Sequence, residues 1–134
     1  MTDIRIRDAA ALLGVSDDTV RRWVSSGALP TTSDAESVTT VDGAELAALA
    51  VERAAGPADD GTGVLRSARN RFTGLVTAVV RDRVMAQVTL QCGPFQVTSL
   101  MSAEAAAELD LEPGVIATAV VKATTVIVER KTDR

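Results

Sequence analysis

Apolar residues recur at a spacing of three and four through the first third of the chain, which predicts amphipathic helices. Residues 9–13 supply the apolar face of the first helix, and Gly14 with Val15 makes a tight turn after it. Ser16 is a good N-cap for a second helix, which stops at Gly27, and Asp42 is placed to cap a third. This order of helix, glycine turn, helix, loop and helix is typical of a small helix-turn-helix domain with a wing.

The period changes in the second half of the chain, where β-branched residues dominate short stretches bounded by turns. The predicted strands cover residues 72–80, 84–90, 95–101, 115–121 and 124–128. A short helix over residues 103–109, capped by Ser102, falls between the third strand and the fourth. Five short strands with one helix in that place predict a small OB-like β-barrel. The chain as a whole is therefore predicted to be of the α+β class.

A small, polar and glycine-rich stretch separates the two patterns. Residues 54–65 are therefore predicted to be a flexible linker. It divides a helix-turn-helix domain at residues 1–53 from a β domain at residues 66–134. The chain contains no internal repeat, so the β unit occurs once.

Composition narrows the chemistry that these domains can perform. Only 2% of the 134 residues are aromatic, so the cores must be built from Val, Leu, Ile and Ala. The absence of histidine removes the commonest general base and the commonest transition-metal ligand. Paired carboxylates and a nucleotide-binding glycine loop are not recognisable either. We therefore expect no enzyme, no cofactor and no metal site.

The single cysteine, Cys92, excludes an internal disulfide and fits a reducing compartment. The first residues show no export signal, and no apolar stretch is long enough to span a bilayer. These features predict a cytoplasmic protein that does not associate with membranes.

Charge is unevenly distributed along the chain. The net charge is −4, and residues 1–55 hold five Arg and Lys against nine Asp and Glu, whereas residues 56–134 hold nine of each. An acidic first half is unfavourable for a DNA-binding domain, because neutralisation of phosphates supplies most non-specific affinity.

The helical segments nevertheless resemble a known DNA-binding domain. Residues 6–16 and 19–30, which end in a Trp-containing helix followed by Gly-Ala-Leu-Pro, resemble the MerR/excisionase-type domain. The resemblance implies that the second helix contacts DNA, and the position of Trp23 on the apolar face of that helix predicts that it lies in the core. The candidate DNA-binding residues are Ser16, Thr19, Arg21 and Arg22. Asp17 and Asp18 in the same helix oppose this, as does the acidic segment 34–39, where relatives carry a basic cluster.

Polar residues at the ends of predicted strands suggest an anion site in the second half. Ser67 and Arg69 precede the first of these strands, and Lys122 follows the fourth. A tetrahedral dianion has four acceptor oxygens and no donor, so its pocket needs donors and no carboxylates. A hydroxyl, a guanidinium and an ammonium meet that requirement, and charge-assisted hydrogen bonds of this kind contribute about 1.5–3 kcal/mol each.

The motifs at residues 67–70, 109–114 and 121–124 resemble the Mop domain of molbindins, also called the TOBE domain, and the match runs from about residue 67 to residue 128. In that family molybdate or tungstate lies between subunits, held by hydroxyls, backbone amides and basic side chains. The residues that the resemblance places in the oxyanion site are Ser67, Arg69, Asn70, Ser102, Lys122 and Ala123.

A site that lies between subunits implies homo-oligomers, because this chain has one β unit. The resemblance implies a dimer or an assembly up to a trimer of dimers. Together the two halves predict a molybdate-responsive transcriptional regulator. The alternative is a cytoplasmic molybdate-storage protein whose helical domain no longer binds DNA. The sequence leaves open whether the ion is molybdate, tungstate or another oxyanion such as sulfate.

Overall fold

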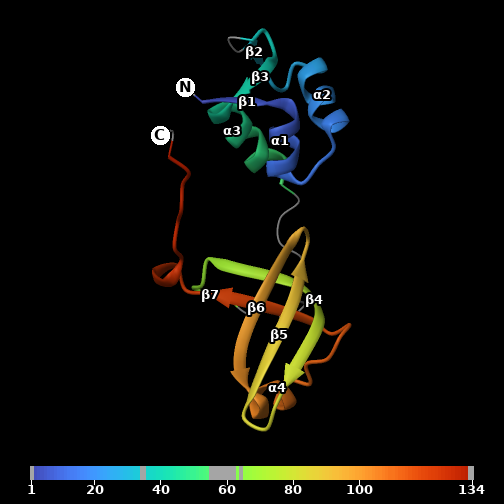
Figure 1. Ribbon diagram of the computed structural model, residues 1–134, viewed down its shortest axis with the longest axis vertical. Coiled ribbons are helices and arrows are strands. Elements are labelled where there is room, and N and C mark those ends of the chain that lie inside the picture. Colours follow the sequence, from blue (N-terminus) through green and yellow to red (C-terminus); the bar gives the residue numbers. More distant parts are fainter. Residues whose placement is uncertain (1, 34–35, 55–62, 64, 133–134) are drawn as a thin grey trace. The chain divides into compact units, whose positions relative to one another are not determined.

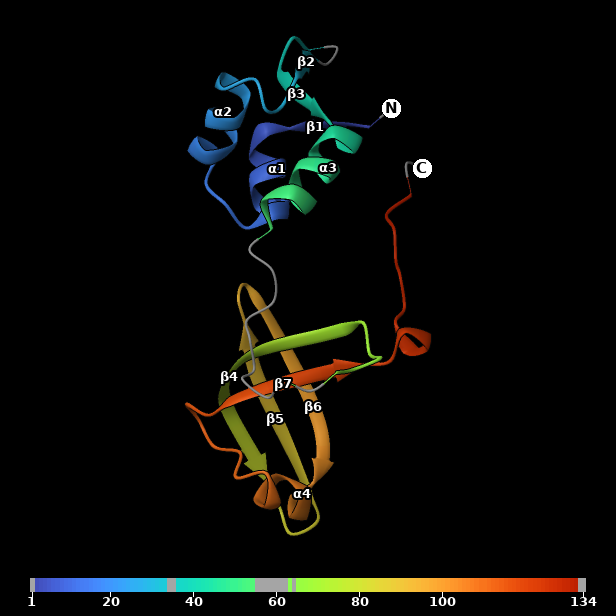
Figure 2. The same ribbon diagram turned by 180° about the vertical axis from the view of Figure 1, so that it is seen from behind.

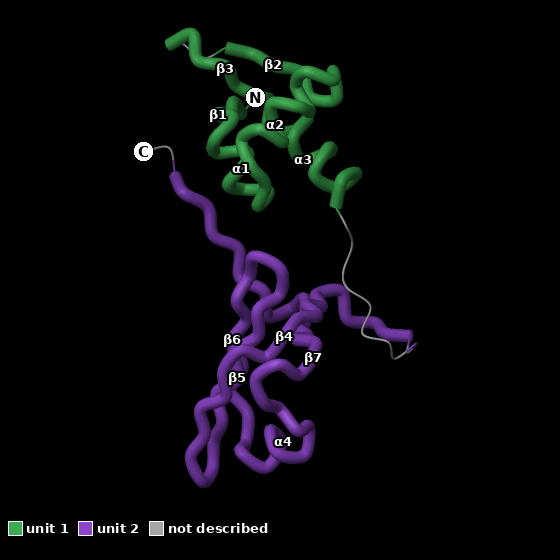
Figure 3. Tube along the Cα trace, turned by 90° about the vertical axis from the view of Figure 1, so that its right-hand side faces the viewer, with its two compact units in different colours: residues 1–55 green, residues 56–134 purple. Residues whose placement is uncertain are grey.

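The computed structural model describes residues 2–33, 36–54, 63 and 65–132. The chain divides into two compact units, residues 1–55 and residues 56–134, which Figure 3 shows in green and purple. Most of the predicted linker, residues 54–65, lies outside the described residues. Within the described part of the chain, the helices are too short or too polar to cross a bilayer.

The three predicted helices of the N-terminal unit are present (Figure 1). They are α1 (Ile6–Leu13), α2 (Asp17–Ser25) and α3 (Gly43–Arg53). Gly14 ends α1 with φ 67°, a left-handed conformation that glycine adopts without strain. The hydroxyl of Ser16 accepts from the amide of Thr19 at 3.1 Å, and a carboxylate oxygen of Asp42 accepts from the amide of Glu45 at 3.2 Å. Both predicted N-caps are therefore confirmed.

A three-stranded sheet completes this unit. Its strands, in the spatial order β1-β3-β2, are β1 (Asp3–Arg5), β3 (Thr39–Asp42) and β2 (Thr31–Ser33). The antiparallel pair of β2 and β3 is the predicted wing. β1 was not predicted, because three residues are too short to show an alternating pattern. It adds to the open edge of β3 and places Ile4 opposite the buried Val41.

One small aliphatic core holds the N-terminal unit together. Trp23 is half-buried and packs against this core, as predicted. Its fully buried members are Ala9, Ala10, Val20, Leu29, Val41, Leu46 and Leu49.

The C-terminal unit is a curled antiparallel sheet of four strands with one short helix (Figure 2). The elements are β4 (Asn70–Arg81), β5 (Met85–Cys92), β6 (Phe95–Ser102), α4 (Ala103–Glu108) and β7 (Ile116–Val121). Their spatial order is β6-β5-β4-β7. This confirms the first four predicted strands, the helix and the OB-like order.

The curl of the sheet follows from the pairing of β4. The first half of this strand, from Asn70 to Leu75, pairs with β7, and the second half, from Leu75 to Arg81, pairs with β5. The register with β5 shifts between Val76 and Ala78, and such a bulge bends a strand and increases its twist. The concave face holds a core of Val76, Val88, Leu90, Cys92 and Leu111.

The sheet has four strands in place of the expected five. Residues 124–128 do not form a strand, because the 3-10 turn η1 (Ala123–Thr125) starts where that strand would begin. The amide and the hydroxyl of Thr125 both donate to the carbonyl oxygen of Lys122, at 3.0 and 2.9 Å, which closes the turn. The apolar side chains after it are left in solvent, with Ile127 85% and Val128 88% exposed.

Candidate functional site

The ladder between β4 and β7 brings together two segments of the predicted oxyanion site. Asn70 opens β4 and pairs with Val121, the last residue of β7. Because the strands are antiparallel, Arg69 and Lys122 leave the ladder at the same end. The side-chain amide of Asn70 donates to the carbonyl oxygen of Val121 at 3.2 Å and ties the two strand ends together. Segments some fifty residues apart in sequence are thus neighbours in the fold.

The donors at this end of the sheet are open to solvent. Ser67, Arg69, Lys122 and Ala123 are exposed, and Asn70 is half-buried. Lys122 is the N-cap of η1, so the first amides of that turn have no carbonyl partner within it. One amide hydrogen of Asn70 is used by Val121, which leaves the other as a donor. The end of the ladder thus offers two cations and amides, and the hydroxyl of Ser67 lies three residues before β4 in the chain.

The two chain segments that lead to this end of the sheet carry basic residues and no acidic ones. No Asp or Glu occurs from residue 61 to 81 or from 113 to 128, although both signs are common elsewhere. Besides Arg69, and Arg81 at the far end of β4, the first of these stretches holds two more arginines, Arg66 and Arg71, which the sequence motifs did not single out. Their signal was the clustering of three arginines within six residues. Such focusing lets an acidic protein attract an anion.

Ser102 lies away from these residues within one chain. It ends β6 and pairs with Met85, whereas Arg81 pairs with Ala86, so Ser102 belongs to the end of the sheet where β4 finishes. Its hydroxyl accepts from the amide of Ala105 at 3.0 Å and caps α4, as predicted. The resemblance places the oxyanion site between subunits, and within one chain Ser102 does not lie beside Lys122. β4 has twelve residues; Lys122 lies near its first residue, Asn70, and Ser102 lies near its last residue, Arg81.

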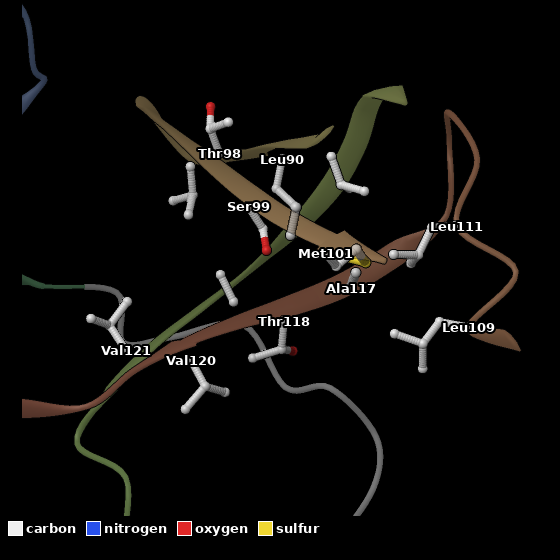
Figure 4. A pocket seen from close by; sticks show the side chains of 13 residues that line it. Leu90, Thr98, Ser99, Met101, Leu109, Leu111, Ala117, Thr118, Val120 and Val121 are labelled. Atoms are coloured by element: carbon white, nitrogen blue, oxygen red, sulfur yellow. The ribbon is translucent and has the colours of Figure 1, made fainter. Parts of the chain in front are cut away.

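The pocket on the concave face of the sheet does not suit an anion. It measures about 260 Å³, and its lining carries no charged side chain (Figure 4). Leu90, Met101 and Leu111 form its apolar floor, and Thr98, Ser99 and Thr118 are its few polar members. The lining comes from both edge strands of the sheet, β6 and β7, together with β5 and the segment after α4. The pocket is thus the open interior of a half-barrel.

Cys92 and metal binding play no visible part in the site. The thiol of Cys92 is buried, and burial raises its pKa above the ordinary value, which keeps it protonated. Its sulfur lies 3.5 Å from the carbonyl oxygen of Phe72 and donates to it. Across the described segments, no group of three or more His, Cys, Asp and Glu could hold a metal ion.

Three of the four candidate DNA-binding residues form one chain of hydrogen bonds at the start of α2. The hydroxyls of Ser16 and Thr19 lie 2.9 Å apart, and the guanidinium of Arg22 donates to the Thr19 hydroxyl at 3.1 Å. Ser16 is therefore committed to capping the helix, and Thr19 orients Arg22. Arg21 points to a different neighbourhood. It lines a hollow with Arg5, from β1, and other residues.

This second hollow gathers positive charge in the N-terminal unit. It measures about 350 Å³ and is lined by Arg5, Ile6, Arg7, Arg21, Val38 and Thr39. Neither Arg5 nor Arg7 was selected from the sequence. The available signal was the alternation of Ile4 and Ile6, which pack on the core, with the two arginines.

Comparisons with known proteins match both units. Residues 66–128 match the TOBE domain, and residues 4–50 match a helix-turn-helix domain. A comparison with curated proteins finds no match.

Three solved structures resemble the C-terminal half, each with a TM-score of 0.47. MopII from Clostridium pasteurianum is 36% identical, over 49% of this chain and 100% of that chain. A molybdate-binding protein from Sporomusa ovata is 31% identical, over 50% of this chain and 100% of its own. The cytoplasmic molybdate-binding protein ModG, with molybdate bound, is 45% identical over 51% of this chain and 49% of ModG. The chain therefore belongs to the TOBE-domain family through residues 66–128 and carries a helix-turn-helix domain at residues 4–50.

Proposed function

We propose that the protein binds molybdate or a similar tetrahedral oxyanion through its TOBE domain and acts as a molybdate-responsive transcriptional regulator. The observation that carries the first part is the meeting of Arg69 and Lys122 at one end of the β4–β7 ladder. That end of the domain has cations, a hydroxyl and amides but no carboxylate in the adjoining sequence. A small dianion needs this set of donors.

Titration calorimetry tests the oxyanion site. Wild-type protein is titrated with molybdate, tungstate and sulfate, and the same series is repeated on Lys122→Ala and Arg69→Ala. We expect each substitution to weaken molybdate binding at least about tenfold, the loss of one charge-assisted hydrogen bond. Lys131→Ala and Arg83→Ala are the matched controls, because both residues are exposed and lie outside the proposed site. Folded wild-type protein that takes up none of the three ions contradicts the proposal.

We further propose that the binding unit is a homo-oligomer. Ser102 and Lys122 lie at opposite ends of β4, so the full donor set implied by the family requires two chains. The concave pocket reaches both edge strands, and the exposed apolar residues 126–128 have the composition of a strand. A second copy that supplies this segment would cover both apolar surfaces.

Light scattering coupled to size exclusion tests the assembly. Wild-type protein should be at least dimeric, and Ile127→Asp should shift it towards the monomer and weaken molybdate binding together. Thr132→Asp adds the same charge to the exposed end of the described chain and should change neither. Monomeric wild-type protein with full molybdate affinity would refute this assembly.

The regulatory role rests on the helix-turn-helix domain. Gel-shift experiments with the promoter that the protein controls, with and without molybdate, test it directly. A change in DNA affinity with molybdate supports a regulator, and the absence of any shift at low salt opposes it.

A specific observation favours the alternative, a cytoplasmic molybdate-storage protein. The N-terminal unit carries nine acidic against five basic residues. One of the basic residues, Arg5, is already paired with Glu36 of the wing at 2.9 Å. Stoichiometric molybdate binding without measurable DNA affinity would select this alternative.

A further inference from the structure

We propose that the hollow lined by Arg5, Arg7 and Arg21 receives one phosphate of a nucleic-acid backbone, and that Glu36 competes with this phosphate for Arg5. The inference rests on the proposed DNA-binding function and adds to it a contact point and an internal competitor.

Three elements converge on the hollow. Arg5 comes from β1, Arg7 from the first turn of α1 and Arg21 from α2, and the rim is completed by the start of β3. Arg5 extends from the end of β1, where its neighbour Ile4 packs on the core, and Arg7 extends from the first turn of α1. Arg7 also lies 3.7 Å from a carboxylate oxygen of Asp8, and both of these side chains are open to solvent, so this pair is weak as well.

The chemistry of the hollow fits a phosphate diester. Arginine forks match the paired oxygens of a phosphate, and the start of α1 contributes amides that have no partner within the helix. Arg5 is the N-cap residue of α1, but its side chain makes no capping hydrogen bond to the first amides of the helix. In helix-turn-helix proteins the second helix lies in the major groove of DNA and the first helix crosses the backbone, and α2 and α1 both contribute to this hollow.

The wing already places an anion on one of these arginines. A carboxylate oxygen of Glu36 lies 2.9 Å from a terminal nitrogen of Arg5. The pair is open to solvent, with side chains 41% and 73% exposed, so it is weak enough for a phosphate to displace. Bound DNA would also meet the displaced Glu36 as a like charge. Both effects make Glu36 an inhibitor of backbone binding.

Fluorescence anisotropy with a labelled duplex of mixed sequence at low salt tests the inference on the full chain. Glu36→Gln should tighten binding by about threefold, because it removes one anionic partner of Arg5 and a negative charge from the interface. Arg7→Gln should weaken binding by about tenfold. In a chain that already carries Arg5→Gln, Glu36→Gln should tighten DNA binding less than it does in the wild-type chain, because the competition for Arg5 is gone. Glu52→Gln and Arg53→Gln, which make the same charge changes at the end of α3, are the controls.

A second readout separates this inference from the proposed function. The side-chain NMR signals of Arg5, Arg7 and Arg21 are followed during titration with the duplex and with inorganic pyrophosphate. If pyrophosphate moves these signals but no duplex binds, the hollow is an anion site and the DNA-binding function is refuted. If duplex binds while Glu36→Gln and Arg7→Gln behave as their controls, the function stands and the hollow is refuted. Signals that neither ligand moves also overturn the inference.

Discussion

Gly74 in β4 is, among the described glycines, the one where an added Cβ atom would meet its neighbours most closely. A Cβ atom at this position would overlap the carbonyl oxygen of Gln91 and would lie 2.8 Å from the sulfur of Cys92. The strand can cross β5 this closely only without a side chain. This is the place where β4 changes partner from β7 to β5, so the glycine is part of the curl.

We expect Gly74→Ala to destabilise the C-terminal unit by about 1–3 kcal/mol, the range for forcing an extra methyl group into a packed site. Urea unfolding followed by far-UV circular dichroism measures this. Cys92→Ala should not rescue the variant, because the nearest atom is a backbone oxygen that cannot move aside. Full rescue by Cys92→Ala would show that the sulfur sets the limit instead.

Asp82 holds the turn between β4 and β5. One of its carboxylate oxygens accepts from the amides of Val84 and Met85, both at 2.8 Å. These hydrogen bonds, that of Met85 first, lower the pKa of Asp82 below its ordinary value of 3.8. A lowered pKa in the folded state means that the ionised carboxylate stabilises the fold above pH 3.8. The contribution is lost as the pH falls through the lower folded value.

Asp82→Asn should therefore lower the melting temperature near neutral pH, and the difference from wild type should narrow once the pH drops below 3.8. Thermal unfolding by circular dichroism across this pH range checks the prediction. Glu108→Gln on the exposed end of α4 is the control, with no comparable narrowing expected. A difference that stays constant into strong acid would mean that the carboxylate charge is not what holds the turn.

At the scale of elements, α2 depends on its cap. Ser16 satisfies the amide of Thr19 and has extended backbone angles, as an N-cap should. Ser16→Ala should cost about 1 kcal/mol of stability in the N-terminal unit. Urea unfolding followed by the fluorescence of Trp23, the single tryptophan, reports this unit. Ser16→Asp should retain most of the stability, because aspartate is also a good N-cap residue. Ser25→Ala, at the exposed far end of α2, should have little effect. Equal losses of stability in Ser16→Ala and Ser25→Ala would contradict the role of the cap.

The sequence was a good guide to elements that local patterns define. Helix periodicity, the caps at Ser16, Asp42 and Ser102, and the alternation in the β domain all act within a few residues, and each is confirmed. A local pattern cannot reveal a strand as short as β1. The segment 124–128 shows the converse limit. Its β-branched residues favour a strand, but a strand also requires a neighbour, and the described chain provides none.

The candidate site was predictable only in part, for the same reason. Arg69 and Lys122 could be grouped because the family resemblance places them together, and the β4–β7 ladder accounts for it. The position of Ser102 depends on which strands pair along which half of β4, a non-local property of the sheet. Arg5 and Arg7 were missed because the hollow forms only when β1 and α1 pack beside α2 and the start of β3, which is a tertiary arrangement.

At the scale of the molecule, ligand binding should distinguish the two units. A ligand stabilises the state to which it binds, by about 2.7 kcal/mol at a hundredfold excess over its dissociation constant. The proposed molybdate donors all lie within residues 67–123. We therefore expect molybdate to raise the unfolding transition seen by circular dichroism of the β domain and to leave the transition reported by Trp23 in place.

Thermal unfolding with both signals recorded on one sample measures the effect. Lys122→Ala should abolish the rise, and Lys131→Ala should preserve it. Transitions that move together in wild-type protein would show that the two units unfold as one, and would give the ligand a direct route to the helix-turn-helix unit.

The ion pair between Arg5 and Glu36 has a consequence for how the protein would respond to ionic strength. A phosphate that captures an arginine from solvent releases one counterion from DNA, and affinity then falls steeply as salt rises. Before DNA binds, the charge of Arg5 is already paired with Glu36 of the wing. When a phosphate displaces Glu36, the carboxylate takes up a cation from solution. The logarithm of DNA affinity should thus decline with the logarithm of salt by about one unit less steeply than the number of contacting arginines implies. The DNA affinity of such a protein would therefore change less when the salt concentration around it changes.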